Sequence, residues 1–239
     1  MSALQEQINA GTCESSFTHC VSLPLDRNVQ RWRDIGAEFA STFPLDLTQY
    51  ERLPIRGAQV LDYGAGWGRF IPSIMALSPN AIVAADVCAA ACCRAESHGA
   101  IVEPRWIADP RALRLEVARY DVVLVVGVLS SIVPATERDR LLEQIVRSMR
   151  PGGYVVAADF GASSAPEYTS RYAEVAEEEH TVVTAEGLLV HHFAEGEMES
   201  LISKGLDVED SWCSPVQTVH GRTLPGRVVR ARLRRGARN

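Results

Sequence analysis

The pattern of apolar residues along the chain predicts strands that alternate with helices. Apolar runs of strand length lie at 59–61, 81–85, 101–107, 120–129 and 154–160, with helix-like spacing at 26–42, 70–77, 89–97, 136–150 and 197–204. Two further runs, 206–212 and 227–233, are joined by a short connection. The order predicts an α/β fold with a doubly wound, mostly parallel seven-stranded sheet that an antiparallel C-terminal hairpin closes.

The junction between the first strand and the first following helix is rich in glycine. Asp62 is followed by Gly64, Gly66 and Gly68, so the segment reads Asp-x-Gly-x-Gly-x-Gly. Glycine tolerates positive φ and lets a ligand approach main-chain N–H groups that are unpaired at the start of a helix. The segment therefore predicts a nucleotide-binding turn. The alternative is a flexible turn with no ligand.

The spacing of the glycines separates two nucleotide classes. A dinucleotide fingerprint requires a third glycine where Arg69 stands, which argues against an NAD-dependent oxidoreductase. The segment instead resembles the first motif of the class I S-adenosylmethionine-dependent methyltransferases. The helix, Arg-Pro-Gly-Gly turn and strand over 136–160 also resemble that family, so the likeness covers about 60–160. It implies a Rossmann-like methyltransferase fold, methyltransferase activity and S-adenosylmethionine as the cofactor.

Several residues are expected to contact this cofactor. Asp86 lies 22 residues after Gly64, at the end of the second strand, where a carboxylate accepts hydrogen bonds from ribose hydroxyls. Its alternative role is to cap the helix that follows. The expected contacts at the turn and second strand are Asp62, Gly64, Ala65, Gly66, Asp86 and Val87, with Val87 against the adenine face.

Two more expected contacts follow later strands. The resemblance implies that Asp109 accepts a hydrogen bond from the adenine amino group, although an Asp before Pro110 is also a common turn former. Gly127 is expected to let the backbone approach the methionine part of the cofactor. Ser130 and Ser131 then lie where related enzymes contact the acceptor.

The chain divides into a lead-in and one main domain. Residues 1–50 are expected to form an N-terminal lead-in and a helix over the cofactor, and residues 51–239 the methyltransferase domain. Trp32 fits the core face of that helix better than a pocket. Within the domain, 161–192 is expected to be an inserted cover above the strand ends, where substrate choice is made. Its acidic run 177–179 suits a solvated helix face.

The composition restricts the cellular location and the classes of binding partner that we expect for the protein. The chain has 239 residues and a net charge of −6, which argues against a nucleic-acid partner, and it has no apolar run long enough to cross a membrane. Six cysteines without an export signal favour reduced thiols and a cytoplasmic location. Cys88, Cys92 and Cys93 suit a helix face better than a metal site, so no metal is expected. We expect a monomer or homodimer.

Methyl transfer requires few catalytic side chains. An oxygen or protonated nitrogen acceptor must also lose a proton, and His191 or His192 is the candidate base, since imidazole titrates near neutrality. The alternative is that one histidine faces solvent and the other fills a polar edge of the cover. The expected acceptor is a small molecule of secondary metabolism. The alternative is a catalytically silent S-adenosylmethionine-binding scaffold or regulatory subunit.

Overall fold

The computed structural model describes residues 24–36, 53–112, 114–175, 178–218 and 221–234. The described part is a seven-stranded sheet in the order β3-β2-β1-β4-β5-β9-β8, with a separate two-stranded sheet, β6-β7. The strands of the large sheet are β1 (Gln59–Tyr63), β2 (Ala81–Asp86), β3 (Val102–Trp106), β4 (Tyr120–Val126), β5 (Met149–Phe160), β8 (Asp207–Gln217) and β9 (Thr223–Arg232). The sheet is parallel from β3 to β5, whereas β9 runs antiparallel to β5 and β8. The predicted fold class and closing hairpin are confirmed.

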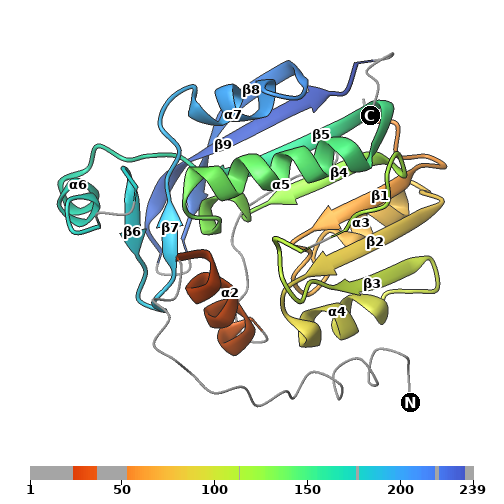
Figure 1. Cartoon of the computed structure of the whole chain (residues 1–239), viewed down its shortest axis with the longest axis horizontal. Coiled ribbons are helices and arrows are strands. Elements are labelled where there is room, and N and C mark those ends of the chain that lie inside the picture. Colours follow the sequence, from red (N-terminus) through yellow and green to blue (C-terminus); the bar gives the residue numbers. More distant parts are fainter. Residues whose placement is uncertain (1–23, 37–52, 113, 176–177, 219–220, 235–239) are drawn as a thin grey trace.

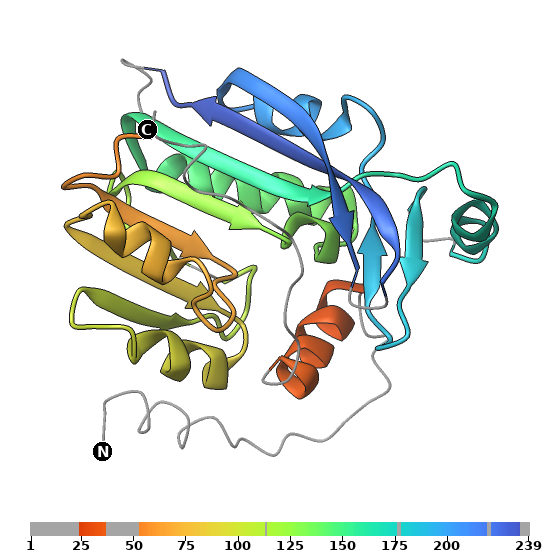
Figure 2. The same cartoon turned by 180° about the vertical axis from the view of Figure 1, so that it is seen from behind.

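Helices cover both faces of this sheet (Figures 1 and 2). The helices are α2 (Pro24–Ile35), α3 (Ile71–Ala76), α4 (Ala89–Glu96), α5 (Ala135–Ser148), α6 (Pro166–Tyr172) and α7 (Glu197–Ser203), with a short 3-10 helix, η2 (Leu129–Ser131). Leu61 on one face of β1 belongs to the core cluster that contains α5 and α7, while Val60 on the other belongs to the cluster that contains α3. This alternation follows from the two-residue period of a strand.

Several boundaries differ from the predicted ones, as in the hairpin, where β8 ends at Gln217 and β9 begins at Thr223. Pro151 and the two glycines after it do not lie between helix and strand, because β5 begins at Met149 and includes them, with a register shift against β4 between Tyr120 and Val122. Helix α2 begins at Pro24, two residues before the predicted start, so Asp26 lies in its first turn, where it pairs with Arg111. The rest of the predicted helix, residues 37–42, lies outside the described residues.

The expected cover forms its own small layer. It contains α6, β6 (Thr181–Val183) and β7 (Leu189–His191), and β6 pairs antiparallel with β7. Figure 1 shows this layer beside the end of the sheet at which β4 finishes, with α2 next to β7. No helix among the described residues is both long and apolar enough to span a bilayer.

Candidate active site

A cavity of about 460 Å³ lies at the carboxyl ends of β1, β2 and β4. Its walls are the glycine turn (residues 64–68), the residues after β2, the residues after β4, and one side of α2. Five of the predicted cofactor contacts line it together with Asp86: they are Gly64, Ala65, Gly66, Val87 and Gly127. We call it the first cavity.

The glycines of the turn have different structural roles. Gly64, Gly66 and Gly68 all have positive φ, at +75°, +53° and +77°. A Cβ on Gly64 would lie 2.2 Å from Val128 Cγ2, and one on Gly68 would lie 2.6 Å from Ile71 Cδ1, so these two glycines allow close packing. A Cβ on Gly66 would meet no atom within 4 Å. Gly66 is therefore the glycine whose missing side chain leaves the cavity open.

Asp86 holds the glycine turn from the end of β2. Its Oδ2 accepts a hydrogen bond from Gly66 N at 2.8 Å, and its Oδ1 accepts one from Cys88 N at 2.8 Å. Burial raises the pKa of Asp86, against the effect of these backbone bonds. The side chain thus fixes the turn and the start of α4, and a carboxylate with two such bonds retains lone pairs toward the cavity.

Asp62 lies beneath the turn and is not among the residues that line the cavity. It is buried, and its Oδ2 has no hydrogen-bond partner among the described residues. Burial, reinforced by the negative charge of Asp86, raises the pKa of Asp62 to about 7. Asp62 therefore places a buried oxygen without a hydrogen-bond partner close to the cavity.

Asp109 does not line the first cavity, although its neighbour Pro110 does. The side chain is exposed, and its Oδ1 accepts a hydrogen bond from Arg111 N at 2.9 Å. This is the turn-forming role that the sequence left open as the alternative. Of the three acids expected around one hollow, only Asp86 faces it.

Helix α2 forms one wall of the first cavity, and the sequence analysis did not predict which of its residues line that wall. Trp32 was assigned to the core but lines the cavity, as do Leu25 and Asn28. Asn28 is completely buried: its Nδ2 donates to Ser131 O and Leu189 O, both at 2.7 Å, and its Oδ1 accepts from Leu189 N at 2.9 Å. This one amide joins α2 to η2 and to the cover.

A second cavity, of about 520 Å³, lies between the sheet and the cover. Trp32, Gly127 and Ser131 line both cavities, so the two spaces lie next to each other at these residues. The walls of the second cavity include Ser130, Phe160, Tyr168 and His192. The sequence placed substrate choice in the cover but gave no signal for which of its residues face inward.

His192 lines the second cavity in an aromatic environment. Its ring centroid lies 5.5 Å from that of Tyr168 and 5.9 Å from that of Phe160, and its Nδ1 is 2.8 Å from Tyr172 Oη. Burial lowers the pKa of His192 to about 3, and the positive charges of His191, Arg171 and His180 add to this effect. The imidazole is therefore neutral at pH 7.

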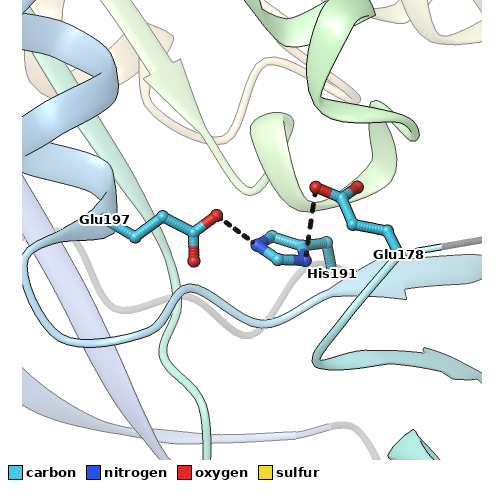
Figure 3. A group of neighbouring side chains, drawn as sticks. All are labelled: Glu178, His191 and Glu197. Carbon is cyan, nitrogen blue, oxygen red and sulfur yellow. Dashed lines mark hydrogen bonds and ion pairs between the residues drawn. The ribbon is translucent and has the colours of Figure 1, made fainter.

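His191 faces a different environment and lines neither cavity. Its Nε2 lies 2.8 Å from Glu197 Oε1, its Nδ1 lies 3.0 Å from Glu179 O, and Glu178 lies beyond Nδ1 (Figure 3). Both ring nitrogens of His191 therefore have a hydrogen-bond partner within the cluster. Of the two candidate bases, only His192 lines one of the two cavities.

The cluster around His191 also corrects the expectation for the acidic run. Glu178 is not on a solvated helix face, because the buried guanidinium of Arg138 donates to both of its oxygens. Glu178, His191 and Glu197 offer ligand atoms within 4.8 Å of one another, but Arg138 already supplies a cation there and lies 3.8 Å from Glu197. The cluster fastens the cover to α5.

Comparisons with known proteins identify the fold and one domain. Residues 60–153 match the family model described as a methyltransferase domain. No curated protein matches the chain by sequence. Among solved structures, a SAM-dependent methyltransferase of Methanosarcina mazei aligns with 80% of this chain and 99% of its own, at 21% identity and a TM-score of 0.72.

Two similar structures were solved with bound ligands. A Burkholderia thailandensis 1,6-didemethyltoxoflavin-N1-methyltransferase, with bound 1,6-didemethyltoxoflavin and S-adenosylhomocysteine, aligns with 92% of this chain and 94% of its own, at 21% identity and a TM-score of 0.63. The N-methyltransferase NodS of Bradyrhizobium japonicum, in complex with S-adenosylhomocysteine, aligns with 87% of this chain and 99% of its own, at 16% identity and a TM-score of 0.61. These likenesses establish the shared fold.

The first cavity fits the cofactor of this family by its own chemistry. It combines a glycine turn with open space above Gly66, the carboxylate of Asp86, and the unpartnered buried oxygen of Asp62 close by. Residues 60–153 therefore form a methyltransferase domain by their match to the family model, and the fold around them is the one seen in SAM-dependent methyltransferases of known structure.

Proposed function

We propose that the protein transfers a methyl group from S-adenosylmethionine to an oxygen or nitrogen atom of a small molecule of secondary metabolism. The observation that carries this proposal is the pair of cavities that lie next to each other at Trp32, Gly127 and Ser131. One cavity is built on the glycine turn, and the other is closed by the cover. Two ligands held in them would meet end to end.

The residues of the first cavity hold the cofactor in this proposal. Gly64, Ala65 and Gly66 supply the backbone of the turn, Asp86 accepts from the ribose, and Val87 and Gly127 pack against the two ends. When bound, S-adenosylmethionine supplies an electrophilic methyl group on a sulfonium. The chain itself aligns the acceptor and excludes water, and such proximity effects are worth up to about 7 to 11 kcal/mol.

His192 is the proposed general base. With the ring proton on Nδ1, directed at Tyr172 Oη, Nε2 has a free lone pair to accept a proton from the acceptor. Phe160 and Tyr168 keep this ring in place and limit water around it. A neutral imidazole is the form that a base requires.

The size and closure of the second cavity support a small acceptor rather than nucleic acid. The two ligand-bound structures of similar fold are named as N-methyltransferases, and one of them holds a small heterocycle, which supports a nitrogen acceptor as one option. The described cysteines, Cys88, Cys92, Cys93 and Cys213, are free thiols, which supports the expected cytoplasmic location. A monomer or homodimer remains the expectation for the assembly.

Turnover with a labelled cofactor tests the function. The protein is incubated with S-adenosylmethionine that carries a deuterated methyl group and with metabolite fractions, and labelled products are sought by mass spectrometry. We expect transfer of the label together with stoichiometric release of S-adenosylhomocysteine. Tight cofactor binding without any transfer would instead support a silent scaffold.

A matched pair of glycine variants controls for cofactor binding. Gly66→Ala places a methyl group in the open part of the first cavity, and should weaken binding of S-adenosylhomocysteine in calorimetry while the protein stays folded. Gly64→Ala should lower stability, because its Cβ overlaps Val128. Equal cofactor affinity in Gly66→Ala and wild type would remove the turn from the cofactor site.

A further inference from the structure

The second cavity contains an uneven distribution of charge. Its charged lining residues are Arg171, Arg222 and Glu186, so guanidinium groups outnumber carboxylates by two to one. Arg171 comes from α6, and Arg222 immediately precedes β9. Two cations therefore reach one cavity from segments that are far apart in the sequence.

Both guanidinium groups lie near the same aromatic ring. The Cζ atom of Arg171 is 5.7 Å from the centroid of Tyr168, and that of Arg222 is 5.9 Å away. Within the described part of the chain, neither arginine forms an ion pair, and Arg171 donates to Val183 O at 2.7 Å. A guanidinium beside an aromatic ring keeps N–H donors at its edge, which suit a carboxylate.

Much of the remaining wall of the cavity is aromatic or aliphatic. Tyr168, Phe160 and His192 form an aromatic wall, and Val182, Leu188, Val190 and Leu224 are further apolar lining residues. Such walls favour a planar ring, since aromatic pairs gain energy beyond the area they bury. The end next to Ser131 and Gly127 lies beside the first cavity, which these two residues also line.

We propose that the acceptor is a planar aromatic molecule with a carboxylate, which Arg171 and Arg222 bind while the ring lies against Tyr168 and Phe160. This inference rests on the proposed function and specifies its substrate class. The nucleophilic oxygen or nitrogen is then at the opposite end of the ring from the carboxylate, near Ser131 and Gly127.

The electrostatics of His192 agree with an anionic acceptor. After burial, the causes that lower its pKa are the cationic neighbours His191, Arg171 and His180. A carboxylate bound to Arg171 offsets one of these charges and raises the pKa of the base toward the operating pH, where general bases work best. An uncharged acceptor leaves the ring a weaker base.

Paired probes test the inference. Protein saturated with S-adenosylhomocysteine is titrated with para-hydroxycinnamate and with para-hydroxycinnamamide, which differ in charge but hardly in shape. We expect the carboxylate to bind about tenfold tighter or more, as for a charge-assisted hydrogen-bonded pair. Arg171→Gln and Arg222→Gln should each reduce this preference, and the double variant should remove it without weakening the amide.

A remote arginine provides the control. Arg234 is exposed and pairs with Asp207, so Arg234→Gln should retain the full preference. Equal affinities for the two probes, or failure of both to bind the loaded protein, would overturn the inference. Saturation with S-adenosylhomocysteine is measured first on the same samples, so a failure of the proposed function is seen separately as failure of that step.

Discussion

Two neighbouring histidines lie in opposite surroundings. His191, the last residue of β7, lies among Glu178, Glu197 and Arg138, whereas His192 lies among the aromatic rings of the second cavity. Both are almost completely buried, at 2% and 3% exposure, so burial does not distinguish them. Successive side chains of an extended segment point to opposite sides, and this alternation separates them.

The comparison shows that the partners decide what a buried histidine does. Burial acts to raise the pKa of Glu197, but the hydrogen bond and charge of His191 outweigh it and hold that pKa below its usual value. No described group of opposite charge acts on His192, whose pKa is lowered to about 3. The ring of His191 is therefore held in place by charged partners, whereas the ring of His192 stays neutral at pH 7 and can accept a proton.

The largest expected effect is on turnover when His192 is changed. With an acceptor that must lose a proton, His192→Gln should lower kcat by about 10² to 10⁴, the usual contribution of a general base. Affinity for S-adenosylhomocysteine should stay unchanged, since His192 does not line the first cavity. Arg234→Gln is the control, because Arg234 is exposed and lines neither cavity. A kcat within threefold of wild type would exclude His192 as the base.

The next effect is on stability when the cluster around His191 loses its arginine. Arg138→Leu leaves Glu178 and Glu197 without their guanidinium and should lower the free energy of unfolding by about 3 to 5 kcal/mol, as for a broken buried ion pair. Urea denaturation measures this loss. Arg140→Leu, on the exposed side of the same helix, should cost less than about 1 kcal/mol. Similar losses in the two variants would contradict the structural role of the cluster.

A smaller effect is the pH dependence of stability that His192 contributes. Its pKa is lower in the folded protein than in the unfolded chain, so the unfolded chain binds more protons between about pH 6.5 and pH 3. Stability from this residue is therefore present above pH 6.5 and is lost as the pH falls. Between pH 7 and pH 5 the loss should be on the order of 2 kcal/mol in wild type and absent in His192→Gln. Denaturation at both pH values measures it, and identical slopes would contradict the assigned environment.

The smallest effect concerns the hydroxyl group that holds His192. Tyr172→Phe removes the partner of Nδ1 and the acceptor for Ser163 N, which should cost about 1 kcal/mol of stability. The ring contacts remain, so the cavity should keep its shape. We expect a several-fold lower kcat with little change in affinity for the acceptor. An unchanged kcat would show that the ring orientation of His192 does not depend on Tyr172.

The sequence predicted the centre of the sheet because β1, β2 and β4 are local apolar runs. The glycine turn and Asp86 were also found from spacing, since a strand-to-helix junction fixes where these atoms lie. Asp109 and Trp32 were misjudged for a shared reason: which way a side chain points after a strand or on a covering helix depends on packing against distant segments. The pairing of Arg138 with Glu178 joins residues 40 positions apart, and no local pattern encodes it.

The single amide of Asn28 has a consequence for the order of events in a catalytic cycle. Because its three hydrogen bonds tie α2 to η2 and to β7, the helix cannot lift from one ligand space without loosening the wall of the other. Occupancy of either space should thus tighten its neighbour, and thermodynamic reciprocity makes this mutual. The two products would then leave after a single opening of both cavities, instead of after two independent openings.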